Sequence, residues 1–323
     1  MLQYCASLIF LLLAAAAPTF ASPPQSDSKS PSDESPGVSY TDEISNRWQV
    51  GVRILAREKT VRNFLVTIPI PTDWPEQRVE LSEEDFPAEI GSVDYRELNS
   101  GVRQMVITIP KIRAKQLIEL TATYHVTTSQ IVAPQNTDVF LIPKKVGKRI
   151  KEYLGVSPQI SYRNAKLRKE VKKVVSEQPT PWKQVEAIYD WVRENIEFAN
   201  EEPDDTLNVF RNRKGCREDS VGLFVAMCRS IKIPARIVWA DQTQYAEFYL
   251  VDETDQGHWF PAKVSGRREF GQLSSPKIIL QKGDNIKVPE KEKRQKFCAE
   301  FVHGEGSIKP VVEFVKKRLP VTN

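Results

Sequence analysis

The stretch KGCREDSVGLFVAMCRSIKIPAR, which runs from Lys214 to Arg236, decides the fold of this chain. It opens with a glycine and a cysteine, Cys216, and continues as an amphipathic helix. The N-terminus of a helix favours negative charge and lowers the pKa of a thiol there, so Cys216 is a candidate nucleophile. The buried stripe of the helix is predicted to consist of Val221, Phe224, Val225 and Cys228.

The segments on both sides of this helix predict a mixed α+β domain. Upstream, PTPWKQVEAIYDWVRENI (179–196) has Thr180 as a helix N-cap and Pro181 at the first helical position. Downstream, IPARIVWA (233–240), QYAEFYLV (244–251) and HWFPAKV (258–264) are typical of three successive strands. A helix followed by successive strands indicates an α+β arrangement.

Residues 44–133 follow a period of two instead. Apolar residues alternate with polar ones, as at Trp48, Val50, Val52 and Ile54, and clusters of proline and glycine separate the runs. This pattern predicts a small β-sandwich, separate from an α+β domain at 134–323. At the C-terminus, VVEFVKKRL (311–319) is interpreted as a short amphipathic helix docked on the core.

The N-terminus resembles an export signal. The apolar run LIFLLLAAAA (8–17) is shorter than the roughly 20 residues of a spanning helix, and small residues follow it. No lysine or arginine precedes it, which weakens the signal. We expect a signal peptide at 1–21, a mature chain from near Ser22, and a disordered Ser/Pro-rich tether at 22–43. The protein is thus predicted to be exported (periplasmic, secreted or envelope-associated), with no membrane span in the mature chain.

Composition narrows the function classes. The chain has 323 residues, of which 40% are hydrophobic, and a formal net charge of +4. Basic and acidic residues are interspersed, which argues against nucleic acid as a partner. The basic runs at 144–151 and 164–175 are interpreted as solvated faces. No signal for the oligomeric state is present.

Cysteine and histidine are scarce. Cys216, Cys228 and Cys298 are too few for a disulfide framework, although one pair could be bridged in an oxidising compartment. Only three histidines occur, at positions 125, 258 and 303, so we expect no metal site and no other cofactor.

The order of the motifs resembles the transglutaminase-like superfamily, which shares the papain-type thiol-enzyme fold. The resemblance runs from about residue 158 to 286. It is carried by AIYDWVRENIEF, RKG, LFVAMCRSIKIPAR, AEFYL, HWFPA and FGQLSSPKIILQKGDNI. It implies acyl transfer, in which a helix-start cysteine attacks a carbonyl, a histidine on the next strand activates it, and an aspartate on the following strand orients the histidine.

In this chain the resemblance places Arg217, Gln244 and Lys263 where the family has its cysteine, histidine and aspartate. Counting back from IPAR and LF without a gap puts Cys216 one residue before the nucleophile position. An extra residue in the helix would rotate the buried stripe by about 100°. Glutamine cannot act as a general base, and lysine cannot accept from an imidazole N–H. A degenerate triad with no catalytic residue is therefore expected.

Three functions follow as hypotheses. The first is a catalytically inactive transglutaminase-like protein that binds a peptide, a protein or an envelope polymer. The second is a thiol acyltransferase, amidase or peptidase that uses Cys216 with His258 or His303 as a displaced base. The third is a structural envelope protein without a groove ligand.

The three triad positions also predict a site. If the family frame is kept, Arg217, Gln244 and Lys263 point into one groove that suits an anion. The competing expectation is an internal ion pair of Arg217 or Lys263, for instance with Glu247.

Overall fold

The computed structural model describes residues 37–320. The predicted signal peptide and residues 22–36 of the predicted tether lie outside this range. Strand β1 (Ser39–Leu55) already begins at Ser39. The tether prediction is therefore wrong for residues 39–43, which belong to β1: Ser39, Tyr40 and Thr41 pair with β6, and a bulge precedes Ile44.

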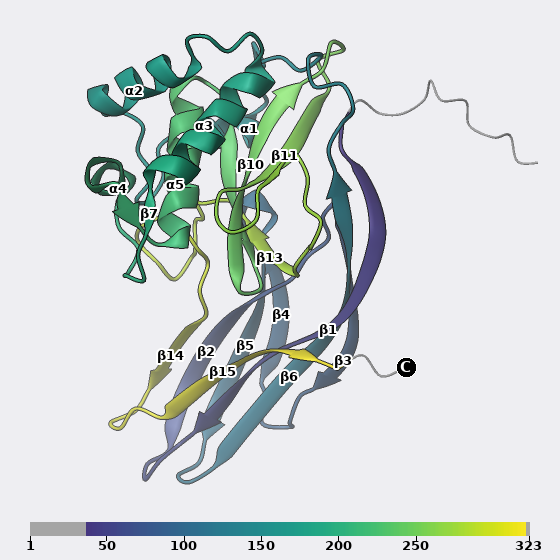
Figure 1. Ribbon diagram of the computed structural model, residues 1–323. Helices are drawn as coiled ribbons and strands as arrows, with labels where there is room; N and C mark the ends of the chain where they lie inside the picture. The colour runs from purple at the N-terminus through teal and green to yellow at the C-terminus, as the bar shows by residue number, and fades with distance from the viewer. Residues whose placement is uncertain (1–36, 321–323) are drawn as a thin grey trace, which may run out of the picture. The chain divides into compact units, whose positions relative to one another are not determined.

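Two antiparallel four-stranded sheets form the predicted β-sandwich (Figure 1). One has the order β15-β1-β6-β3, with β15 (Val311–Leu319), β6 (Leu117–Val132) and β3 (Gln77–Asp85). The other has the order β14-β2-β5-β4, with β14 (Phe301–Glu305), β2 (Val61–Ile70), β5 (Arg103–Ile112) and β4 (Ser92–Glu97). Alternate side chains of both sheets fill the core between them, as the period of two predicts, among them Trp48, Val50, Val52 and Ile54.

The C-terminal helix prediction is wrong. Residues 311–319 form strand β15, which pairs antiparallel with β1 from Arg47↔Leu319 to Leu55↔Val311. Its Val312 and Phe314 contact the sandwich core. Pairing covers an edge of β1 that would otherwise present unsatisfied backbone groups. Strand β14 pairs with β2 in the other sheet, so the chain returns to the sandwich beyond the predicted range of 44–133.

The part of the chain between these sandwich segments is mixed α+β, as predicted. Its five-stranded antiparallel sheet has the order β12-β11-β10-β9-β13. The strands are β9 (Ala235–Ala240), β10 (Thr243–Val251), β11 (Gly257–Lys263), β12 (Glu269–Phe270) and β13 (Ile279–Lys282). The helices are α1 (Lys148–Lys151), α2 (Ala165–Val175), α3 (Pro181–Asn195), α4 (Thr206–Asn212) and α5 (Arg217–Ser230), and β7 (Glu197–Phe198) pairs in parallel with β8 (Lys214–Gly215). None of the described helices is long and apolar enough to cross a membrane.

Helix α5 is the centre of this part. The predicted stripe residues Val221, Phe224, Val225 and Cys228 have no exposed surface. Burial extends around the helix from Asp219 to Arg229, because α2, α3 and α4 cover the sides of α5 that the sheet does not. Helix α3 begins as predicted, with Thr180 accepting a hydrogen bond from the backbone N–H of Lys183.

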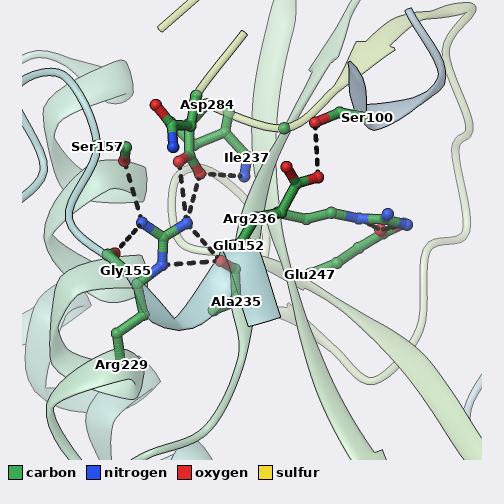
Figure 2. A network of polar contacts seen from close by, with 12 residues as sticks. Ser100, Glu152, Gly155, Ser157, Arg229, Ala235, Arg236, Ile237, Glu247 and Asp284 are labelled. Atoms are coloured by element: carbon green, nitrogen blue, oxygen red, sulfur yellow. Dashed lines mark hydrogen bonds and ion pairs between the residues drawn. The ribbon is translucent and has the colours of Figure 1, made fainter. Parts of the chain in front are cut away.

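A buried arginine ties the end of α5 to three other segments. The guanidinium of Arg229 donates to both oxygens of Asp284, at 2.9 and 2.8 Å (Figure 2). It also donates to the carbonyls of Gly155 and Ala235 and to the hydroxyl of Ser157. Every donor of this fully buried, charged side chain is therefore used.

Four more buried charges join the sandwich to the α+β part. Lys282 donates to Glu76, at 2.6 Å, and to Glu247, at 2.5 Å. Arg236 lies 2.6 Å from the other oxygen of Glu247. Since Glu76 precedes β3 and Lys282 ends β13, these pairs fix the sheet of the α+β part against the sandwich.

Candidate functional site

A cavity of about 280 Å³ opens at the N-terminus of α5. We name it the α5 cavity. Its wall combines the first residue of α5, the start of β10, the end of β11 and the loops on both sides of β12. Its lining residues are Arg217, Thr243, Tyr245, Lys263, Ser265, Gly266, Leu273, Ser275 and Lys277. The lining thus contains three cations, four hydroxyl groups and no carboxylate, thiol or imidazole.

Two of the three predicted triad positions meet in this cavity. Arg217 and Lys263 line it, but Gln244 does not, so the prediction that all three point into one groove is wrong. Side chains alternate along a strand, and Gln244 shares its face with Ala246 and Phe248 in the helix-side core. The cavity side of β10 is taken by Thr243 and Tyr245.

The alternation of apolar residues in β10 could have predicted the side on which Gln244 lies. Ala246 and Phe248 are apolar and flank the motif glutamate Glu247, so even-numbered residues of this strand were candidates for the core face. Counting by two from them puts Gln244 on the core side and Thr243 on the cavity side. Alignment by motif spacing alone did not use this pattern.

Lys263 is paired, but not with the residue expected. Its Nζ lies 3.0 Å from Oε2 of Glu269, because the two residues face each other in the β11–β12 register. The predicted partner Glu247 instead binds Arg236 and Lys282. Glu269 is 2% exposed, and burial alone raises its pKa, but hydrogen bonds from Ser274 and Lys263 outweigh burial and lower it. Glu269 therefore stays ionised beside Lys263.

Arg217 has no such partner. It is exposed, and its guanidinium carbon lies 5.6 Å from the centre of the Phe198 ring. None of the ion pairs within residues 37–320 includes it. The acidic residues that follow it point elsewhere: Glu218 binds Lys296 at 2.7 Å, and Asp219 is buried under the helix start. The charge of Arg217 is thus available to a ligand.

Cys216 is the N-cap of α5 and does not line the α5 cavity. Its backbone N–H donates to Oδ2 of Asp219 at 2.8 Å. Burial raises the pKa of the Cys216 thiol, and the carboxylate of Asp219 raises it further. Little thiolate is present at neutral pH, which is the opposite of what an activated nucleophile requires.

The two candidate bases lie elsewhere. Nε2 of His258 is 2.8 Å from Oδ2 of Asp252, and the ring packs against Phe140 and Phe260. His258 lies five positions before Lys263 on β11, which is about 16 Å along a strand. His303 is exposed on β14 of the sandwich. The structure therefore brings neither histidine to the α5 cavity.

The sequence reasoning missed the Asp252–His258 pair. Hydrogen bonds from Thr254 and Gln256 also fix the Asp252 carboxylate at the turn between β10 and β11. His258 lines a second cavity, of about 270 Å³, together with Tyr40 and Trp259. The sequence has an aspartate and a histidine on either side of the turn between two expected strands, and this pattern could have predicted the pair.

The remaining cysteines are buried and unpaired. Cys216, Cys228 and Cys298 are all free thiols. Burial raises the pKa of Cys298 to about 12 and that of Cys228 still further. In the described part of the chain, no three His, Cys, Asp or Glu residues gather closely enough to hold a metal ion.

Comparison with known proteins agrees with this fold. Residues 168–264 match the family model of the transglutaminase-like superfamily. A solved structure of a candidate cysteine protease from Cytophaga hutchinsonii matches with a TM-score of 0.57 and 16% identity, over 88% of this chain and 94% of that chain. A candidate protease from Parabacteroides distasonis matches with a TM-score of 0.29 and 13% identity, over 74% of this chain and 49% of that chain, too weakly to inform the fold. No curated protein matches the chain.

The protein is thus an α+β protein of the cysteine-protease-like fold class that carries a β-sandwich. Its core resembles the transglutaminase-like superfamily, as the motifs predicted. At 16% identity the structural likeness concerns the fold, and activity has to be argued from the site.

Proposed function

We propose that this chain is an exported, non-catalytic transglutaminase-like protein that binds the carboxylate of a peptide or envelope component in the α5 cavity. The observation that carries the proposal is the cavity wall. Arg217 and Lys263, which the motif spacing assigns to the nucleophile and aspartate positions, both line it, and no thiol or imidazole does. Export rests on the apolar run near the N-terminus.

Acyl transfer needs a nucleophile and a base within hydrogen-bond reach of each other. A guanidinium does not deprotonate in proteins, so Arg217 supplies neither. Lys263 is held in an ion pair with Glu269 and has no other acidic or basic partner among the described residues that could make it a nucleophile. The hydroxyl of Thr243 has no histidine beside it in the cavity. The wall is therefore suited to binding and unsuited to group transfer.

A carboxylate fits this wall for electrostatic reasons. Arg217 is at the positive end of the 14-residue helix α5, and its planar fork suits a carboxylate. Lys277 adds a third cation, and Ser265 and Ser275 add hydroxyl donors. Tyr245 is 2% exposed, and its hydroxyl has no hydrogen-bond partner among the described residues. The volume of about 280 Å³ suits one terminal residue and its neighbour more than a folded domain.

The test is titration of the mature protein with short peptides that differ only in a free or amidated C-terminus. We expect the free-acid peptide to bind more tightly, and its binding to weaken with salt. Arg217→Ala should reduce this affinity about tenfold, since a charge-assisted pair is lost. Lys309→Ala removes an exposed cation of the sandwich and is the matched control. Affinity unchanged in Arg217→Ala rules out the anion site.

The non-catalytic part of the proposal has its own test. The mature protein is incubated with glutamine-bearing and ordinary amide substrates, with and without an added amine. We expect no turnover. Turnover that disappears in Cys216→Ala overturns the proposal in favour of displaced thiol chemistry. Export is tested by the mass of the mature chain, which should begin near Ser22.

A further inference from the structure

A second surface carries a stronger charge than the α5 cavity. Helices α2 and α4 lie on the same side of the α+β part (Figure 1), and a groove of about 780 Å³ separates them. We name it the basic groove. It is lined by six cations, which are Lys166, Lys169, Lys172, Lys173, Arg211 and Arg213. Glu170 is the single acidic residue of its lining.

The charges of the basic groove are uncompensated. None of the six cations takes part in an ion pair within residues 37–320. The carboxylates of the neighbouring helix α3, by contrast, are paired with cations. Lys183 pairs with Glu186, and Arg268, from the loop before β12, pairs with Glu186 and Asp190. Lysines three and four residues apart on one helix repel each other and destabilise the helix. The solvated-face interpretation of residues 164–175 explains one helix, but it does not explain why Arg211 and Arg213 converge on the same groove.

One cation of the groove is held in place. Arg213 ends α4 in a left-handed conformation, with φ of 57°. Its guanidinium carbon lies 4.4 Å from the centre of the Trp191 ring and 4.7 Å from that of Phe210. Its Nη1 is buried and has no hydrogen-bond partner among the described residues. Arg213 is thus held in one orientation in the wall of the groove, and a planar guanidinium suits an oxyanion.

We propose that the basic groove binds an acidic polypeptide segment in an extended conformation. The proposal uses no residue of the α5 cavity and goes beyond the function proposed for it. Lys166, Lys169 and Lys173 follow one another at about 4.5 and 6 Å along the helix axis. Carboxylates on one face of an extended chain recur every 6.6 Å or so, close enough for flexible lysines to follow.

Two other polyanions fit the groove less well. Attachment to an anionic membrane by an amphipathic helix requires large apolar side chains beside the basic ones. In the described part of the chain, the large exposed apolar residues include none on α2 or α4. Single-stranded nucleic acid requires exposed aromatic rings on which bases stack. Phe210 is only 8% exposed, and its ring already contacts Arg213.

The experiment titrates the mature protein with a short poly-L-glutamate peptide and compares two double charge reversals. Lys169→Glu/Lys173→Glu changes the groove, whereas Lys144→Glu/Lys145→Glu makes the same change of net charge in an exposed loop before α1. We expect the groove variant to lose affinity about tenfold or more, and the loop variant to stay within about twofold of the parent. Both pairs of lysines are exposed, so the midpoint of thermal unfolding should hardly change in either double variant.

A further variant tests whether the planar guanidinium of Arg213 contributes to binding. Arg213→Lys keeps the charge but loses the planar donors, and it should weaken binding of poly-L-glutamate several-fold. Arg217→Ala should leave this binding unchanged, which keeps the basic groove distinct from the α5 cavity. Equal loss in both charge reversals would mean a bulk electrostatic effect and would overturn the proposal. Tighter binding to anionic vesicles or to single-stranded DNA, with loss in the groove variant, would overturn the choice of a polypeptide.

Discussion

The Nζ of Lys263 lies 3.0 Å from Oε2 of Glu269, the residue that faces it in the β11–β12 register. The resemblance predicts that Lys263 takes the place of the aspartate that orients the histidine in the family. In the structure, the carboxylate of Glu269 on β12 neutralises this lysine. Glu269 accepts hydrogen bonds from the backbone N–H and the hydroxyl of Ser274 with its other oxygen. The α5 cavity is therefore less positive than its three cations suggest, and Glu269 sets its charge.

Removing this carboxylate should strengthen anion binding. Glu269→Gln keeps an oxygen for the hydrogen bonds of Ser274 and releases the charge of Lys263 into the cavity. We expect the affinity for a free-acid peptide to rise about two- to fivefold, an increase that disappears at high salt. Glu58→Gln, in the exposed turn between β1 and β2 of the sandwich, changes the net charge equally and serves as the control. Equal or weaker binding in Glu269→Gln would show that Lys263 does not contact the ligand.

The Arg229–Asp284 pair should be essential for stability. Both side chains are at most 1% exposed, and Arg229→Met leaves the Asp284 carboxylate buried without its counter-ion. We expect a loss of about 3–5 kcal/mol in the free energy of unfolding, measured by denaturant titration. Arg229→Lys should lose nearly as much, because an ammonium cannot reproduce the fork that reaches Asp284, Gly155 and Ala235.

A double variant separates the charge from the packing. Arg229→Met/Asp284→Asn removes both charges, so it should be more stable than Arg229→Met alone. If the two variants are equally unstable, the loss comes from the backbone contacts of Arg229 and not from the stranded carboxylate.

The Asp252–His258 pair predicts acid sensitivity. Burial raises the pKa of Asp252, but hydrogen bonds from His258, Thr254 and Gln256 outweigh burial and lower it to about 2. An unfolded aspartate has a pKa of about 3.9. The stabilisation is therefore fully present above about pH 4 and is lost as the pH falls toward 2.

The measurement is the midpoint of thermal unfolding between pH 7 and 2. Asp252→Asn should be less stable than the parent at pH 7 and should lose less stability between pH 4 and 2. Asp255→Asn, in the same turn and exposed, should keep the profile of the parent. Parallel profiles for the parent and Asp252→Asn would show that Asp252 does not cause the loss of stability in acid.

The sequence predicted what depends on local periodicity. The period of 3.6 in α3 and α5, and the period of two in β1 and β10, are properties of neighbouring residues, and both were confirmed. Residues 311–319 were misread because Val311, Val312, Phe314 and Val315 fit a helix face as well as a strand. Only the free edge of β1, far away in the sequence, decides between the two.

The site was predicted less well than the fold, for the same reason. Arg217 and Lys263 were placed by motif spacing and do line one cavity. The exclusion of Gln244 and the pairing of Lys263 with Glu269 depend on strand register, which a motif does not encode. The basic groove depends on the approach of α2 to α4, and the sequence shows only two separate basic runs.

The thiol of Cys216 should be unreactive, although a helix begins beside it. The helix start lowers a thiol pKa, but burial and the carboxylate of Asp219 have the larger effect and raise the pKa of Cys216. In the folded protein at pH 7, iodoacetamide should therefore label Cys216 more slowly than in the unfolded chain. The labelling rate should still increase as the pH passes about 8.5, the ordinary thiol pKa.

Mass spectrometry of the labelled peptides separates the three thiols. Cys228 and Cys298 have no exposed surface and should stay unlabelled until the chain unfolds, so Cys216→Ala should take up no label while folded. Asp219→Asn removes a neighbouring negative charge and should speed the labelling of Cys216, provided that its thermal unfolding stays close to that of the parent. Labelling of folded Cys216 at pH 7 that is much faster than in the unfolded chain would indicate an activated thiolate. That result would return Cys216 to consideration as a nucleophile.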